Sequence, residues 1–519
     1  MRDFQQPGRS AACCANGMVA TSHPDAAHAG LKVLEEGGSA ADATLAASAV
    51  LAVVEPQNAG LGGDSFYIHS TADGVVSAYN GSGRTPAALD PETVGAVGQE
   101  SVHSVTVPGA VEALLHLHRD HCRLPLDRLL RPAIDLARNG WLVQPRVAWD
   151  WQFGRERLAA SPTATSHWGR HVTPGDRVFS PALADTLQDI AVRGRRGFYE
   201  GATAAGVIAT LRALGGYHDA DDFAGHRGEA VTPIRTSYRG IDILECPPNG
   251  QGMTVLMMLN MLSGIDMSAV WDDPLRYIHL LAQVSTLAYA ERDRWICDPD
   301  FGATPLARLL SPACADGLRA RLNPDGPIDT PVVDEPEHRD TVYLACVDRD
   351  GNAISFINSI FTDFGSAIYD EASGILLHNR GASFTMQRGH PNALAAGKRP
   401  MHTIIPGLAV KDNRPLMPFG VMGGHYQATG QVQLLSAMLD AGMDPQQALS
   451  LPRHFAYGGV LEIEQTVPQH LADALAAMGH DIRRAERPMG GGQAVWIDHQ
   501  RGVLIGGTDP RKDGYALGH

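Results

Sequence analysis

Apolar and polar residues follow two patterns along this chain, and each pattern predicts a different kind of element. Short runs of β-branched and apolar residues predict strands, whereas longer runs rich in alanine predict helices. The clearest local pattern is a hairpin. Val342 to Val347 is its first strand, Asp350-Gly351-Asn352 is its turn, and residues 353–357 return as its second strand.

The other elements give a mixed α and β chain. Further strands are expected at residues 18–22, 65–69, 75–80, 231–238, 241–245, 375–377, 404–410, 418–422, 494–498 and 503–506. Helices are expected at residues 26–36, 41–53, 429–441 and 468–478, and most of residues 108–322 is expected to be helical. Two layers of antiparallel sheet, covered by helices, satisfy this order of elements.

The hairpin has an unusual entrance. A polar segment, residues 323–340, is predicted to be an exposed loop and leads through Asp340 directly to Thr341. If the bond between these two residues is cut, Thr341 gains a free α-amine beside its own hydroxyl, and that amine can serve as the hydroxyl's general base. From the hairpin alone, the β-propensity of threonine explains its position equally well.

Composition indicates a globular protein, with 44% hydrophobic and 19% charged residues among 519. The formal net charge of −15 argues against nucleic acid or an anionic membrane as a partner. The sequence shows no signal peptide and no apolar run long enough to span a bilayer, which predicts a cytoplasmic protein. We also find no internal repeat and no interdomain linker.

Cysteines and histidines do not indicate a metal or a disulfide framework. The seven cysteines are odd in number and scattered without a CxxC pair, which predicts reduced thiols. Cys346, in the middle of a predicted strand, is expected to be a small core residue. The 22 histidines show no HExxH or paired ligand spacing. We therefore expect no metal and no cofactor. The glycine cluster from Gly60 to Asp64 lacks phosphate-loop spacing and is predicted to be a structural turn.

Taken in order, the motifs resemble those of γ-glutamyltransferases, which are N-terminal-nucleophile hydrolases. The landmarks run nearly from end to end: Gly37-Gly38-Ser39-Ala40-Ala41-Asp42-Ala43, Val54-Glu55-Pro56, Gly60-Leu61-Gly62-Gly63-Asp64-Ser65-Phe66, Tyr289-Ala290-Glu291-Arg292, Asp298-Pro299-Asp300-Phe301, Asp348-Arg349-Asp350-Gly351-Asn352-Ala353, Phe364-Gly365-Ser366 and Gly506-Gly507-Thr508-Asp509-Pro510-Arg511. The resemblance implies an α+β fold, a four-layer αββα sandwich formed as one domain by residues 1–519. It also implies a proenzyme that cleaves itself before Thr341 into a large chain, 1–340, and a small chain, 341–519, which stay associated. A homodimer is possible.

The resemblance also implies a mechanism. The Thr341 hydroxyl would attack the Asp340 carbonyl, and water would open the resulting ester. The freed Thr341 would then attack an amide substrate and form an acyl-enzyme. Gly423 and Gly424 match the paired glycines whose N–H groups hold the oxyanion. Without the resemblance, they would be taken as an ordinary glycine turn.

The predicted pocket departs from the family's pattern. The hairpin is typically followed by Thr-x-Asn, and the aligned residues here are Ser359 and Phe361. Ser359 keeps a hydroxyl that can orient the nucleophile, but the phenylalanine side chain can neither donate nor accept a hydrogen bond. The typical Gln and Asp that hold a substrate's α-ammonium align with Arg380 and Ser383.

Two further positions differ. The typical Ser-Ser is replaced by Met401-His402, and the typical arginine that pairs with the substrate's α-carboxylate falls near Ser82, with Arg84 two residues later. His402 is either a proton shuttle or a hydrogen-bonded structural histidine.

These departures predict a changed acyl specificity. An ammonium without its carboxylate partner loses most specific binding, whereas the planar fork of Arg380 suits a carboxylate. We expect an acyl group with a carboxylate and no α-amine, of the oxamate or glutaryl type. In the alternative, Arg380 pairs internally with an acid and γ-glutamyl compounds such as glutathione are still accepted.

Two readings of another class compete with a self-processing amidohydrolase or acyltransferase. An uncleaved, non-catalytic scaffold would have no use for Thr341, Ser359 and the two glycines, all of which are present. A metallohydrolase lacks its ligand spacing.

Overall fold

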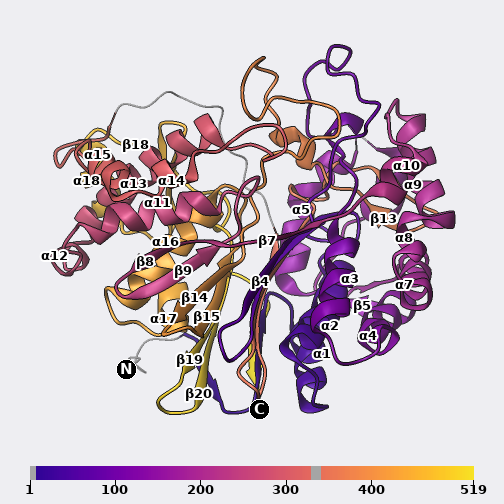
Figure 1. Ribbon diagram of the computed structural model, residues 1–519, viewed down its shortest axis with the longest axis horizontal. Helices are drawn as coiled ribbons and strands as arrows, with labels where there is room; N and C mark the ends of the chain where they lie inside the picture. The colour runs from indigo at the N-terminus through magenta and orange to yellow at the C-terminus, as the bar shows by residue number, and fades with distance from the viewer. Residues whose placement is uncertain (1–7, 160, 329–340) are drawn as a thin grey trace.

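Two stacked antiparallel sheets form the centre of the molecule. The computed structural model describes residues 8–159, 161–328 and 341–519, and within these residues each of the two main sheets has seven strands. Apolar side chains from both sheets meet in one cluster, which includes Tyr343, Phe66, Leu408 and Val495. Figure 1 shows the sheets nearly edge-on, with helices on both outer sides. The predicted four-layer αββα sandwich is confirmed.

The first sheet contains the hairpin predicted from the sequence. Its strands, in spatial order, are β21 (Ala516–Gly518), β2 (Met18–Thr21), β10 (Val342–Val347), β11 (Ala353–Ser359), β3 (Asp64–Ser70), β4 (Val76–Asn80) and β7 (Glu229–Val231). The second sheet runs β1 (Ala12–Cys14), β20 (Val503–Thr508), β19 (Gly492–Asp498), β15 (Arg414–Val421), β14 (Gly407–Lys411), β9 (Ile241–Glu245) and β8 (Ile234–Tyr238).

Smaller pairings lie outside these two sheets. They are β5 (Trp141–Leu142) with β6 (Arg177–Val178), β12 (Tyr369–Asp370) with β13 (Ile375–Leu376), and β16 (His454–Tyr457) with β17 (Val460–Ile463) and β18 (Asp481–Arg484).

Helices cover the outer face of each sheet (Figure 1). On the first sheet lie α1 (Pro24–Glu35), α2 (Ala40–Val54), α3 (Ala110–His121), α4 (Leu126–Asn139), α5 (Pro145–Leu158), α6 (Pro162–Trp168), α7 (Pro181–Arg193), α8 (Arg196–Tyr199), α9 (Gly201–Ala213) and α10 (Ala220–Gly225). On the second lie α11 (Gly252–Ser263), α12 (Ser268–Trp271), α13 (Pro274–Trp295), α14 (Leu306–Leu309), α15 (Pro312–Arg319), α16 (Tyr426–Leu439), α17 (Pro445–Leu449) and α18 (Gln469–Ala477). Short 3-10 helices are η1 (Val102–Ser104) and η2 (Arg380–Ser383).

The alanine-rich α2 forms the interior of the first helical layer. All of its residues are buried, and a capping box between Ser39 and Asp42 satisfies its first N–H groups. Small side chains let α1 and the sheet approach it closely. Of the seven cysteines, none forms a disulfide, and Cys346 is buried in this core.

Prolines explain two wrong boundaries. Residues 231–238 were predicted as one strand, but Pro233 lacks an N–H for a ladder, and the segment divides into β7 and β8, which belong to different sheets. The strand predicted at 404–410 begins only at Gly407, after Pro406. Eight short strands were not predicted: β1, β5, β6, β12, β16, β17, β18 and β21.

No described helix combines the length and apolar character needed to cross a membrane. Likewise, no group of three or more metal-ligating side chains occurs among the described residues.

The predicted glycine turn brings two backbones together. A β-carbon at Gly62 would lie 2.1 Å from the Leu376 carbonyl oxygen, and one at Gly63 would lie 2.4 Å from the Ser359 carbonyl oxygen. Only glycine permits both approaches, because real β-carbons do not come so near to backbone oxygen. The turn therefore sets the position of Asp64 against the end of β11.

We predict that Gly62→Ala destabilises the protein by about 1–3 kcal/mol or more, because the methyl group displaces backbone rather than a flexible side chain. Urea unfolding measures the change. Gly98→Ala is the matched control, since a β-carbon there meets nothing within 4 Å. Equal unfolding midpoints for the two variants would contradict the close approach.

Candidate active site

A row of polar residues crosses the end of the first sheet. Ser359 on β11 pairs with Asp64 on β3, and Val342 on β10 pairs with Asn358, so Thr341 continues the row next to Ser359. Paired residues share a face of the sheet. Tyr343, two residues after Thr341, belongs to the apolar cluster between the sheets, so the row faces the same space.

The Thr341 hydroxyl is held from strand β11 and from helix α16. Its side chain is buried, with 1% of the residue exposed. Thr341 Oγ1 donates to Ser359 Oγ at 3.3 Å and accepts from Gln427 Nε2 at 3.4 Å. Gln427 Oε1 in turn accepts from the Ile405 N–H at 3.1 Å. The predicted cleavage partner, Asp340, lies outside the described residues.

Arg380 is linked to this nucleophile through one side chain, because both residues bond to the Ser359 hydroxyl. Its guanidinium donates through Nη1 to Thr403 Oγ1 at 2.7 Å and through Nη2 to Ser359 Oγ at 3.4 Å. The guanidinium also lies over the Phe361 ring, 3.9 Å from the ring centre. Arg380 is buried, with 1% of its surface exposed. Phe361 has φ of 83°, in the left-handed region, and its N–H donates to Ser359 Oγ at 2.8 Å. The structure thus brings together Thr341, Ser359, Phe361 and Arg380, which the sequence placed in one pocket.

Asp64 lies on the neighbouring strand β3, where it pairs with Ser359. Its Oδ1 accepts from the N–H groups of Gly83 and Gly109, each at 3.1 Å, and its Oδ2 accepts from His402 Nε2–H at 3.0 Å. Burial alone would raise the pKa of Asp64, but His378, His402 and Arg380 outweigh it, so the pKa lies below its ordinary value. Asp64 is therefore an ionised carboxylate with its oxygens satisfied.

Hydrogen bonds assign one tautomer to each of two nearby histidines. His402 Nδ1 accepts from the Ile404 N–H at 3.4 Å, and His378 Nδ1 accepts from the Arg380 N–H at 3.1 Å. Both rings therefore carry their proton on Nε2 and are neutral. Burial, with Arg380 nearby, lowers the pKa of His402 to about 3, and burial also lowers the pKa of His378. This geometry favours the structural role for His402 over the proton shuttle.

Gly423 and Gly424 lie between β15 and the start of α16. Their φ values are 114° and 60°, which other residues rarely adopt. Neither N–H donates to an acceptor among the described residues. Gln427, in the first turn of α16, contacts Thr341, so these N–H groups belong to the nucleophile's end of the helix, where the helix dipole favours an anion.

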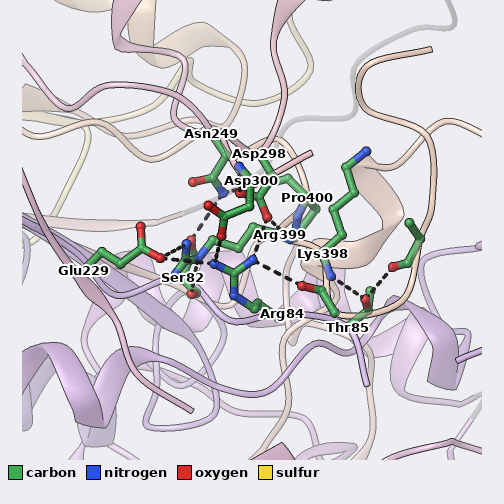
Figure 2. Close-up of polar contacts among 12 residues, drawn as sticks. Ser82, Arg84, Thr85, Glu229, Asn249, Asp298, Asp300, Lys398, Arg399 and Pro400 are labelled. Atoms are coloured by element: carbon green, nitrogen blue, oxygen red, sulfur yellow. Dashed lines mark hydrogen bonds and ion pairs between the residues drawn. The ribbon is translucent and has the colours of Figure 1, made fainter. Parts of the chain in front are cut away.

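Arg84 does not join this group. Figure 2 shows it among three acids: Nη1 donates to Asp298 Oδ2 at 2.9 Å, and Nη2 donates to Asp300 Oδ2 at 2.6 Å and to Glu229 Oε1 at 3.1 Å. Its charge is neutralised by the protein.

The remaining predicted residues are peripheral to the row. Ser82 Oγ donates to Asn80 Oδ1 at 2.6 Å. It also accepts from Asn249 Nδ2 at 3.2 Å, and Figure 2 shows these two side chains next to each other. Ser383 ends η2, and its hydroxyl bonds to none of the described groups.

Sequence reasoning missed several residues that hold the site. Gln427 and Thr403 contact Thr341 and Arg380 directly. Gln251 donates to the carbonyls of Thr403 and Gly424, at 2.7 and 3.0 Å, and so links the arginine side of the site to the glycines. Gln251 Oε1 accepts from buried Arg292 at 2.6 Å. The only signal was their closeness to recognised motifs.

With this geometry in view, the chain was compared with known proteins. The model of the family described as Gamma-glutamyltranspeptidase matches residues 26–519. The chain belongs to the gamma-glutamyltranspeptidase family. The predicted resemblance is confirmed.

Individual relatives agree with this assignment. The "Glutathione hydrolase-like YwrD proenzyme" of Bacillus subtilis is 37% identical, over 96% of this chain and 98% of its own. The "Oxamate amidohydrolase proenzyme" of Klebsiella pneumoniae is 32% identical, over 97% and 98%. The crystal structure of a cephalosporin acylase from Bacillus halodurans, 36% identical, superposes with a TM-score of 0.92 over 100% of this chain and 99% of that one. The chain is an amide-hydrolysing enzyme of the N-terminal-nucleophile type, as predicted.

We predict that His402→Gln makes unfolding less sensitive to acid. As pH falls below about 6.5 the unfolded histidine takes up a proton, whereas folded His402 stays neutral until about pH 3. For each pH unit that the solution is made more acidic in this range, protonation of the unfolded His402 lowers the free energy of unfolding by about 1.4 kcal/mol. The variant, which can still donate to Asp64, should lose that part of the slope.

Urea unfolding at several pH values between about 6 and about 4 measures the slope. His28→Gln, at an exposed histidine, is the matched control. Parallel slopes for His402→Gln and the parent protein would show that folded His402 is charged.

Proposed function

We propose that this protein is a self-processing threonine amidohydrolase or acyltransferase that cleaves before Thr341 and accepts acyl groups bearing a carboxylate and no α-amine. Oxamate-type and glutaryl-type amides are the proposed substrates. The observation that carries the proposal is the Arg380 guanidinium, buried and bonded to the same Ser359 hydroxyl as Thr341.

The chemistry uses groups already in position. After cleavage, the Thr341 α-amine takes the proton of Oγ1, which attacks the amide carbonyl. The N–H groups of Gly423 and Gly424 receive the oxyanion, the amine leaves with the proton, and water or a second amine releases the acyl group. Ser359 and Gln427 keep Oγ1 in place during both halves of the reaction.

Strand pairing supports lasting association of the two proposed chains. β10 pairs with β2, and β11 pairs with β3, so residues before and after the proposed cut share the same sheet. Their separation would expose two strand edges and the core between the sheets. We therefore propose that cleavage leaves the fold intact.

Electrostatics supports the proposed acyl specificity. A buried guanidinium repels an α-ammonium and attracts a carboxylate. Arg84, the other candidate for a carboxylate, is already paired with Asp298, Asp300 and Glu229. Arg380, which donates to the hydroxyl that contacts the nucleophile, is therefore the arginine that we propose to bind the substrate's carboxylate. A relative named for oxamate, which carries a carboxylate and no amine on that side, is consistent with this proposal.

A γ-glutamyl hydrolase is the second candidate, favoured by the relative named as glutathione hydrolase-like. Glutaryl and γ-glutamyl groups differ only by the α-ammonium. Comparing the turnover of a glutaryl amide with that of the matching γ-glutamyl amide therefore distinguishes the two candidate functions.

We predict that Thr341→Ala abolishes both processing and turnover, because the alanine lacks a hydroxyl. Denaturing electrophoresis should show a single persistent band for the 55.4 kDa chain. Thr341→Ser, which keeps a hydroxyl, should still be processed. Amide hydrolysis by pure Thr341→Ala protein would refute the nucleophile, and an unprocessed parent chain would favour the non-catalytic scaffold.

We predict that Arg380→Met lowers kcat/KM for glutaryl 4-nitroanilide by about 10²-fold, since a charged hydrogen bond contributes about 1.5–3 kcal/mol. The parent enzyme should prefer the glutaryl to the γ-glutamyl anilide, and the variant should show a smaller preference. Steady-state kinetics on both anilides tests this.

Arg84→Gln is the matched control, because the protein neutralises that arginine. It should leave the ratio of the two anilides unchanged. Faster turnover of the γ-glutamyl anilide by the parent enzyme would instead support the second candidate.

A further inference from the structure

A small cavity lies where helix α6, the start of helix α7 and strand β12 meet. Its volume is about 200 Å³, and its lining includes Ser166, His167, Ser180, Ala182, Tyr369 and Glu371. None of these residues belongs to the group around Thr341. Pockets for drug-sized ligands have volumes of about 300–1,000 Å³, so this cavity suits a molecule of only a few heavy atoms.

The start of α7 lacks the bonds that usually satisfy a helix end. Ser180 is the N-cap residue, and an N-cap serine normally accepts through its hydroxyl from an N–H of the first turn. The Ser180 hydroxyl makes no such bond and has no partner among the described residues, while only 2% of the residue is exposed. The N–H of Ala182, in the first turn, also donates to none of the described acceptors.

His167 supplies a second polar atom without a partner. Its ring stacks on that of Tyr369, with centres 5.0 Å apart and an angle of 22° between the planes. His167 Nε2 is buried and bonds to none of the described groups. Burial and the nearby Arg170 lower the pKa of His167, although Glu371 opposes them. The ring is therefore neutral, and Nε2 can take part in one hydrogen bond.

A negative charge lies at the exposed rim of the same cavity. Glu371 is exposed, and its Oε1 accepts from Ser166 Oγ at 2.8 Å. The described residues provide no ion-pair partner for this carboxylate. The start of α7 favours a negative group, because its N–H groups and the helix dipole point there. Glu371 favours a positive group. The two sides of the cavity therefore suit the two charges of one small molecule.

We propose that this cavity is a binding site for a small zwitterion of the α-amino-acid class. The ligand's carboxylate lies at the start of α7 and accepts from the Ser180 hydroxyl, the Ala182 N–H and His167 Nε2–H. Its ammonium group lies at Glu371. The stacked rings of His167 and Tyr369 form an apolar wall for a short side chain. The site is separate from Thr341 and does not depend on the chemistry proposed there.

The first test is calorimetric titration of the full-length protein with three probes of similar size. L-alanine carries both charges, propionate lacks the ammonium group, and ethylamine lacks the carboxylate. L-alanine should bind, and each of the other two should bind at least about tenfold more weakly, because each loses one set of charged hydrogen bonds. Absence of L-alanine binding up to about 10 mM would show a cavity that holds water alone and would overturn the proposal. Equal binding of propionate or ethylamine would overturn the zwitterion assignment.

Two variants remove one group from each side of the cavity. Glu371→Gln keeps the size of the side chain and removes its charge, and Ser180→Ala removes a hydroxyl that caps nothing. Each should weaken L-alanine binding about tenfold or more. Glu35→Gln is the matched control, because it changes an exposed acid at the end of α1, and it should leave the affinity unchanged. Unchanged affinity in either cavity variant would overturn the assignment. Thermal unfolding without ligand confirms that each variant is folded.

A further variant separates this cavity from the pocket at Thr341, which under the proposed function also admits an amine. Arg380→Met changes that pocket and should leave L-alanine binding unchanged. Loss of binding in Arg380→Met, with full affinity in Glu371→Gln, would place L-alanine beside Thr341 and overturn the new site. The readout is binding without turnover, so this proposal and the proposed function can fail independently of each other.

Discussion

The positive charge of Arg380, enclosed between two sheets, is the constraint on which the site depends. Removing a guanidinium from water costs several kcal/mol unless hydrogen bonds and nearby charges compensate. Here the compensation comes from the hydroxyls of Thr403 and Ser359, the face of Phe361 and the ionised Asp64. Because Ser359 also receives the Thr341 hydroxyl, the groups that keep the arginine buried also orient the nucleophile.

The surrounding histidines are neutral chiefly because they are buried, and the same positive charge adds to the effect. His378 and His402 both lie near Arg380, and both accept a backbone N–H at Nδ1. A second positive charge there would be repelled by the arginine and would lose those bonds. Asp64, held by the N–H groups of Gly83 and Gly109, is an ionised counter-charge for Arg380. The attraction between Arg380 and Asp64 helps to keep both side chains charged in the buried site.

Three buried or half-buried arginines around the site illustrate how context decides the role of one residue type. Arg84 is neutralised by three acids, Arg292 supports Gln251, His425 and Tyr457, and Arg380 contacts the hydroxyl next to the nucleophile. Each is a permanent donor with the same planar fork. Their partners differ, and only the last adjoins Thr341.

The amino-acid sequence alone was sufficient to predict the β10–β11 hairpin, the buried helix α2 and the family, because strand alternation, alanine content and ordered motifs are properties of neighbouring residues. It also placed Ser359, Phe361 and Arg380 in one pocket with Thr341. It could not show that Arg84 is occupied, since its acid partners lie 145 to 216 residues away along the chain. Nor could it show that Gln427 reaches Thr341, or which ring nitrogen of His402 carries the proton. Those facts depend on which side chains two stacked sheets bring within hydrogen-bond distance, and only the tertiary structure determines that.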